Sequence, residues 1–330
     1  MSIDVAYDSR FFHCFPRPKA DESEDATFER GLKILAFMKE VGIVLAPEIV
    51  EWDVSLVSGC AEQHRVLQRR ACFTELGVSE LGAHSTAFGP IALSFSTSGL
   101  RGVGAMPVIY VPQGMEAGVL SQISTFCMRG VHHTQAVLRQ LETLKEASDP
   151  TLLATRYGAT ISPNLILTLQ NTGQTGEVIT EYGVSATDVR HVLQHVGFNN
   201  IPFDHSIGIL NVFQNMFYPT DNLHAGEALG YYRQREWRLI AGGINFGGRP
   251  MGRELSAVEM ARLHEIDTRF WTQELIVEGA RCQRSALALV YDPLPSWCFF
   301  DLVQTIFVPK HRVAQVRAIV GNAVVLCPYE

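Results

Sequence analysis

The chain has 330 residues, a formal net charge of −7 and a hydrophobic content of 47%. This length supplies apolar side chains for one large domain or two, and the acidic balance gives no overall electrostatic footprint for nucleic acid. No apolar run reaches membrane-spanning length, and the first residues lack a basic-then-apolar leader, so we expect a cytoplasmic protein. The seven cysteines are scattered without a Cys-x-x-Cys pair, which predicts reduced thiols and argues against a disulfide framework or a zinc ribbon.

The first part of the chain predicts a strand, a helix and two further extended segments. Arg10 to Phe15 is an aromatic run typical of a short strand. Phe28 to Val41 carries an apolar stripe at helical steps and is followed by Gly42 as a stop. We expect extended chain at 43–50 and again at 66–75.

Two short apolar runs, Ile91 to Phe95 and Pro107 to Val111, predict buried strands because each is far below helical length. Hydroxyl side chains cluster at the end of the first run and are followed by glycines; they belong to Ser94, Ser96, Thr97 and Ser98. This arrangement favours a ligand-binding loop. The alternative is a polar loop that closes a hairpin or a crossover.

The segment 114–225 predicts a largely helical insertion. A long helical pattern covers 114–146, a strand, loop and second strand follow at 161–183, and a helix runs over 189–196 behind a capping box formed by Ser185 and Asp188. The chain then returns to the main domain. We therefore expect a core domain formed by 1–113 with 226–330, and an insertion at 114–225.

The last part of the chain predicts a core strand over Tyr231 to Ile240 with Trp237 buried, then a glycine-rich loop that lacks a nucleotide-binding pattern. A helix capped by Ser256 is expected over 255–275, strands at 285–291 and 302–308, and a last helix at 310–319. These elements predict an α+β fold with a mixed, mostly antiparallel sheet and a helical insertion.

Two groups of side chains could carry chemistry. His191 and His195 lie at i and i+4 on a predicted helix, but no third ligand is evident, so we expect no metal. In the segment around Trp237, alternation along a strand places Gln234, Glu236 and Arg238 on one face. A carboxylate flanked by arginines stays ionised. The alternative is a structural Arg–Glu pair at a strand edge.

The chain resembles bacterial abortive-infection proteins of the AbiGi type. The matching pieces occur in the same order along nearly the whole chain; they are Phe12-His13, Cys72 to Glu75, His84, Phe88-Gly89, Ile91 to Ser96, Gly104 to Val108, Tyr231 to Arg238 and Phe307 to Pro309. The resemblance implies a role in phage defence or in a toxin–antitoxin module, with a cognate toxin or antitoxin protein as partner. In such modules this type is labelled the antitoxin.

A second, weaker resemblance is to ADP-ribosyltransferases. Those enzymes place an Arg or His on an early strand, a Ser-Thr-Ser strand next and a Gln/Glu-x-Glu motif last. The chain has Arg10 and His13, then Ser96-Thr97-Ser98, then Gln234-Arg235-Glu236.

This second resemblance implies NAD as substrate, with catalytic roles for Glu236, Gln234 and Ser96. It implies cofactor contacts from a further set of residues, namely Arg10, His13, Ser94, Thr97, Ser98 and Arg238. Two hypotheses follow: a phage-defence protein with an NAD-using transferase core, or a non-catalytic antitoxin or interaction module of the same family. The first requires His13, Ser96 and Glu236 to converge on one cleft.

Overall fold

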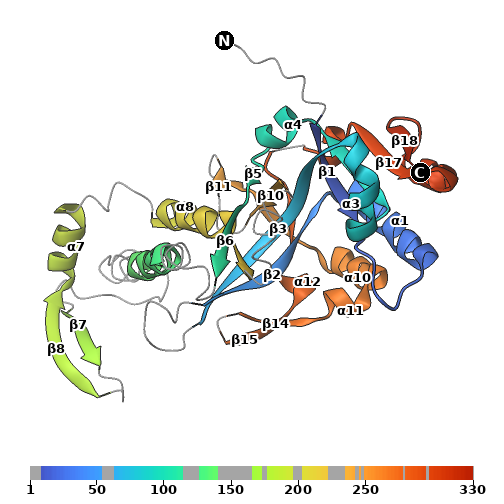
Figure 1. Ribbon diagram of the computed structural model, residues 1–330. Coiled ribbons are helices and arrows are strands. Elements are labelled where there is room, and N and C mark those ends of the chain that lie inside the picture. Colours follow the sequence, from blue (N-terminus) through green and yellow to red (C-terminus); the bar gives the residue numbers. More distant parts are fainter. Residues whose placement is uncertain are drawn as a thin grey trace, which may run out of the picture. The chain divides into compact units, whose positions relative to one another are not determined.

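The computed structural model describes residues 9–53, 63–113, 126–139, 166–172, 177–195, 203–221, 235–241, 245–246, 249–277, 279–294 and 297–329. The chain forms two compact units (Figure 1): Met1–Cys127 together with Val212–Glu330, and Met128–Asn211. The second unit lies within the predicted insertion. None of the helices in the described part of the chain is long and apolar enough to cross a membrane.

The elements of the first unit are, in chain order, β1 (Ser9–Phe15), α1 (Glu24–Glu40), β2 (Val44–Asp53), β3 (Gln63–Gly77), η1 (Val78–Glu80), α3 (Leu81–Phe88), β4 (Ile91–Phe95), α4 (Thr97–Gly102), β5 (Met106–Pro107), β6 (Ile109–Gln113), β9 (Phe217–Asp221), β10 (Glu236–Ile240), β11 (Asn245–Phe246), β12 (Arg249–Pro250), β13 (Gly252–Glu254), α10 (Ala257–Ile266), α11 (Thr268–Trp271), β14 (Glu274–Val277), β15 (Ala280–Gln283), α12 (Arg284–Leu287), β16 (Leu289–Tyr291), η4 (Phe299–Leu302), β17 (Thr305–Pro309), η5 (Lys310–Arg312), α13 (Val313–Val320) and β18 (Val325–Tyr329). The second unit contains most of a helix at 126–139, the hairpin β7 (Ile166–Thr172) and β8 (Val178–Ser185), and α7 (Ala186–His195). Helix α8 (Phe203–Met216) runs across the boundary.

A ten-stranded sheet forms the centre of the first unit. Its main path is β13-β16-β2-β3-β1-β4-β17-β18, and β10 joins it beside β3 and carries β5 on its other side. The strands along this path pair antiparallel except that β17 and β18 run parallel. This confirms a fold that mixes helices with a mostly antiparallel sheet.

The sheet divides at β3. Thr74 pairs with both β10 and β1, which places those two strands on opposite edges of β3. Arg70 pairs with both β10 and β2, so β2 lies on the same edge as β1. Pairing with β2 reaches Arg70 and pairing with β1 starts at Thr74. The shared edge therefore opens at 71–73, and Figure 1 shows β2 and β1 along opposite ends of β3.

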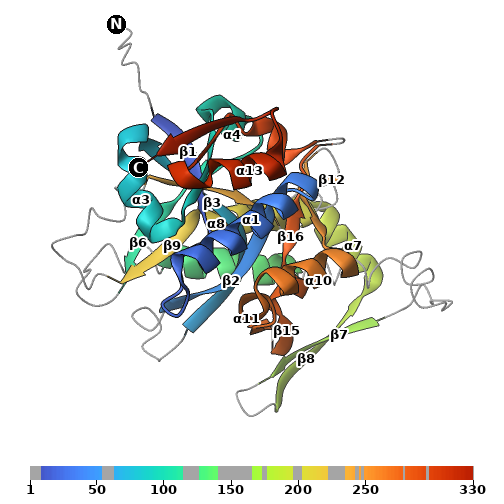
Figure 2. The ribbon, with the colours of Figure 1, turned by 90° about the vertical axis from the view of Figure 1, so that its right-hand side faces the viewer.

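One face of this sheet, the core face, is apolar. It carries Phe11, Phe73, Phe95 and Ile306, which belong to one buried cluster together with residues of α1, α13 and η4. Figure 2 shows α1 and α13 side by side over this sheet. Burial of such large side chains is the main stabilising contribution of the fold.

The opposite side, here the second face, is divided in two. Near β1, β4 and β17 it is apolar: Phe12, Ala92 and Phe307 pack beneath Leu81 of α3. Near β2, β3 and β10 it is polar. Strands β6 and β9, which pair in parallel as a separate two-stranded sheet, contribute tyrosines to that polar half. The candidate site lies there.

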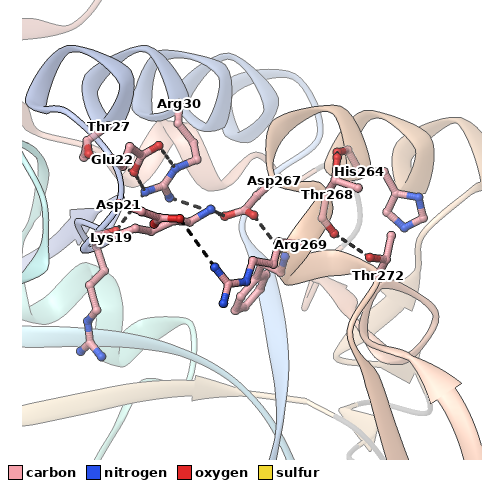
Figure 3. A network of polar contacts seen from close by, with 12 residues as sticks. Lys19, Asp21, Glu22, Thr27, Arg30, His264, Asp267, Thr268, Arg269 and Thr272 are labelled. Atoms are coloured by element: carbon pink, nitrogen blue, oxygen red, sulfur yellow. Dashed lines mark hydrogen bonds and ion pairs between the residues drawn. The ribbon is translucent and has the colours of Figure 1, made fainter.

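A further polar cluster fastens the loop before α1 to the junction of α10 and α11 (Figure 3). Arg30 donates to Glu22 at 2.9 Å and lies 3.8 Å from Asp267, which also pairs with Lys19 at 2.7 Å. Asp267 ends α10 and accepts from the N–H of Phe270 at the start of α11. The charged side chains of this cluster are paired with one another. Asp267 caps the next helix, and α10 therefore ends before it.

Three predicted elements are corrected. The helix expected over 255–275 ends at Ile266, because Asp267 caps a new turn, and residues 274–277 form a strand. The strand expected over 285–291 begins only at Leu289, after the short helix α12. The run Pro107 to Val111 is split between β5, which pairs with β10, and β6, which pairs with β9.

Candidate functional site

Glu236 and Arg238 lie side by side on the second face, as alternation along β10 predicts. Arg238 Nε donates to Glu236 Oε1 at 2.7 Å. Trp237, between them, points to the core face, where its ring meets Phe11 edge-on with centroids 5.1 Å apart. Trp237 is only partly buried, less than the sequence leads us to expect. The described strand covers Glu236–Ile240.

The carboxylate of Glu236 is held by neighbours on three strands. Its Oε2 accepts from the hydroxyl of Tyr110 on β6, and the thiol of Cys72 on β3 lies close enough to affect its pKa. Burial raises the pKa of Glu236, but the charge of Arg238, the thiol of Cys72 and the hydrogen bond from Tyr110 outweigh burial, so the net pKa lies below its usual range. Its side chain is 13% exposed. The group is therefore ionised and neutralised internally.

The pair continues into a network across β3, β2 and β9. Arg238 and Arg70 both donate to Gln68 Oε1, at 3.3 and 2.6 Å. Arg70 also pairs with the carboxylate of Glu48, which accepts from the hydroxyl of Tyr218 at 3.3 Å. We call Gln68, Arg70, Glu48, Tyr110, Tyr218, Glu236 and Arg238 the polar network.

Two of its members join β9 and the end of α8 to the sheet. The ring of Tyr218 lies 4.7 Å from the guanidinium carbon of each arginine, Arg70 and Arg238, in cation–π geometry. Gln68 Nε2 donates to the carbonyls of Gln214 and Phe217 at 2.9 and 3.1 Å. Gln68 is fully buried, and its amide makes four hydrogen bonds. Such complete satisfaction is what a buried amide requires.

The thiol of Cys72 and the hydroxyl of Tyr110, which both lie near Glu236, are not activated as nucleophiles. Burial, together with the nearby Glu236, raises the pKa of the Cys72 thiol to about 11. Burial and Glu236 likewise raise the pKa of Tyr110. Neither group is anionic at neutral pH, so neither serves as a nucleophile there. The hollow beside Arg238, lined by Met106 and Ile240, has no room for a water molecule.

His13 lies at the opening of the sheet and not beside Glu236. Its Nδ1 donates to the carbonyl of Cys72 at 2.8 Å, in the gap where β3 has no strand partner on that edge. Its ring contacts Phe15 and Phe73 on the core face, with centroids 5.5 and 5.4 Å away. Burial lowers the pKa of His13. The side chain therefore fills the missing hydrogen bond of the ladder.

The hydroxyl residues separate into three environments. Ser94 is buried on the second face, and its Oγ has no hydrogen-bond partner among the residues that the structure describes. Ser96 caps α4 by accepting from the N–H of Gly99 at 3.0 Å. Thr97 and Ser98 are exposed on that short helix. Glu236, Thr74, Phe12 and Ser94 lie opposite one another on four adjacent strands. Ser94 is therefore three strand spacings, about 14 Å, from Glu236.

The predicted site residues are thus brought together only in part. The structure joins Glu236 and Arg238. Arg10 and His13 occupy alternate-face positions of β1, with His13 toward the core face. Ser96 has its structural role at the start of α4. Gln234 lies outside the described residues.

No group of three or more potential metal ligands exists within the described residues. His191 and His195 are both exposed on α7. Six of the seven cysteines stand as free thiols in the structure, and the seventh, Cys60, lies outside the described residues.

Sequence reasoning missed most of the polar network. A partial signal did exist at the end of β3, where Cys72 and Thr74 alternate with Ala71 and Phe73, but Arg69 beside Gln68 and Arg70 breaks the period-2 pattern that would predict one polar face. The tyrosines on β6 and β9 carried no such signal, because their partners lie more than a hundred residues away in the chain.

Comparisons with known proteins identify no relative: no family model matches the chain, and neither a curated protein nor a solved structure does.

Proposed function

We propose that this chain is a non-catalytic, partner-binding protein of the abortive-infection type, acting as the antitoxin-like member of a toxin–antitoxin pair in phage defence. The family part of this proposal rests on the motifs that resemble AbiGi-type proteins. The non-catalytic part rests on one observation: the negative charge of Glu236 is already paired with Arg238, and its carboxylate also accepts from Tyr110, in a buried network.

This observation matters because a transferase glutamate must offer its charge to the substrate. Electrostatic catalysis needs groups aimed at the place where charge develops. Here the carboxylate is directed at an arginine of its own strand, and His13 is directed at a backbone carbonyl of β3. A structural Arg–Glu pair is the simpler account of the motif.

The test compares NAD turnover with biological protection. We expect purified wild-type chain to release no nicotinamide from labelled NAD. We also expect Glu236→Gln to keep phage protection, or neutralisation of the cognate toxin, in cells that accumulate it at wild-type level. Glu80→Gln, an exposed glutamate paired with Arg235, is the matched control.

The transferase hypothesis predicts the opposite pattern. Nicotinamide release by wild-type chain that falls about 100-fold or more in Glu236→Gln, with Glu80→Gln unaffected and the fold of both variants intact, would overturn the non-catalytic proposal. If both variants lost protection, the loss would not be specific to Glu236, and it would say nothing about a catalytic role for that residue.

A further inference from the structure

Strands β6 and β9 have a special place in the chain. Strand β6 ends at Gln113 and β9 begins at Phe217, so the whole segment between them, which contains the second unit, leaves and returns through this pair. The two strands pair with each other in parallel over five residues and form a sheet separate from the ten-stranded one. We call them the stem.

Side chains of the polar network join the stem to the ten-stranded sheet. From the stem, Tyr110 donates to Glu236 and Tyr218 donates to Glu48. From the sheet, Gln68 reaches across to the carbonyl of Phe217. A backbone bond from Val108 to Glu236, 2.9 Å long, precedes the stem.

The apolar part of this attachment includes Tyr110 and Val111, which are buried, whereas Ile109 on the same strand is 40% exposed. The stem pairs as a sheet of its own, outside the ten-stranded one. Separate supersecondary units of this kind can open locally at a lower free energy than the core.

We propose that the polar network is a releasable attachment for the stem. Opening it detaches β6 and β9, and with them both ends of the inserted segment, while the core face of the sheet stays folded. This proposal stands apart from the proposed function, since it needs neither NAD chemistry nor a partner.

Hydrogen–deuterium exchange on the full chain tests it with Tyr110→Phe and with the double variant Tyr110→Phe/Tyr218→Phe, which remove only hydroxyls. The matched control is Tyr329→Phe, which removes a hydroxyl that donates to Pro90 at 2.7 Å on the ten-stranded sheet. We expect peptides over 109–113 and 217–221 to exchange about five- to tenfold faster for each bond lost. Peptides over 91–95 and 305–309 should keep their wild-type rates.

The control variant should leave stem exchange unchanged. The proposal is overturned if wild-type stem peptides are as well protected as 91–95, or if the tyrosine variants speed exchange equally in stem and core. It is also overturned if neither tyrosine variant changes stem exchange. Circular dichroism of each variant separates local opening from global unfolding.

Discussion

The two faces of the ten-stranded sheet are built on different principles, although the same strands supply both. On the core face, Phe73 and its neighbours are held by area removed from water, which requires no particular partner. On the second face, Glu236 and Arg238 each depend on a specific partner. Strand β10 shows the contrast within three residues, since Trp237 packs against Phe11 while its neighbours join the polar network. The first face confers stability, and the second fixes which segments meet.

Phe73→Ala should produce the largest loss of stability. Phe73 is fully buried, and its ring lies 5.4 Å from that of Phe95. Truncating such an aromatic residue costs about 3–5 kcal/mol, from lost burial and the cavity left behind. Urea denaturation measures the change, with Thr97→Ala on an exposed site as control. A loss below about 1 kcal/mol would show that the core face is not the main support.

Arg238→Met tests the second face. It leaves the carboxylate of Glu236 buried without its cation, and breaking a buried pair from one side costs about 3 kcal/mol. Adding Glu236→Leu should recover part of this loss, because no unpaired charge then remains. Denaturation of the two single variants and the double variant gives the coupling. A double variant as unstable as the sum of the single ones would contradict an interaction between the two residues.

Acid should weaken the fold in two separable windows. Burial lowers the pKa of His13 below its unfolded value of 6.5, so the folded state binds fewer protons and stability is lost as the pH falls below 6.5. The pKa of Glu236 is also lowered, so its contribution disappears at more acidic pH, as pH falls from the unfolded value of 4.5 through the folded one. His13→Asn should abolish the loss of stability with falling pH in the first window and leave the loss in the second window unchanged. Thermal melts from pH 7 to about pH 2 cover both windows, and a slope below 6.5 that is unchanged in His13→Asn would contradict a neutral His13 in the folded protein.

Arg235→Gly should have the smallest effect, within about 1 kcal/mol. Arg235 has a φ of 44°, a left-handed conformation that glycine adopts without strain. The substitution also removes the exposed pair with Glu80, which contributes little. The two changes oppose each other. A loss of several kcal/mol in a denaturation experiment would mean that Arg235 supports the polar network.

Local signals carried most of what could be predicted from the sequence. Periodicity and capping residues located α1 and β4, and Ser256 does form the capping box that starts α10. Alternation placed Glu236 and Arg238 on one face. Helix α8 and strand β18 were missed, although Phe203, Ile207 and Leu210 lie at helical steps and a short apolar run follows Gly321.

The rest depended on contacts between distant residues. Tyr110 and Glu236 are 126 residues apart, and Gln68 and Phe217 are 149 apart. Nothing in the spacing of these residues indicates that they meet. The role of His13 was equally hidden, because its partner is a carbonyl that is free only where the sheet divides.

The order of strands in the sheet also bears on how the chain acquires its structure during synthesis. Strand β4, near the start, is flanked by β1 and by β17, which is made about two hundred residues later. The core cluster includes Ile306, Val316 and Val320. A ribosome must therefore complete most of the chain before this core can close, whereas the second unit is contiguous and can form earlier. Such long-range closure favours slow folding, and the exposed strands of the growing chain are a natural substrate for chaperones.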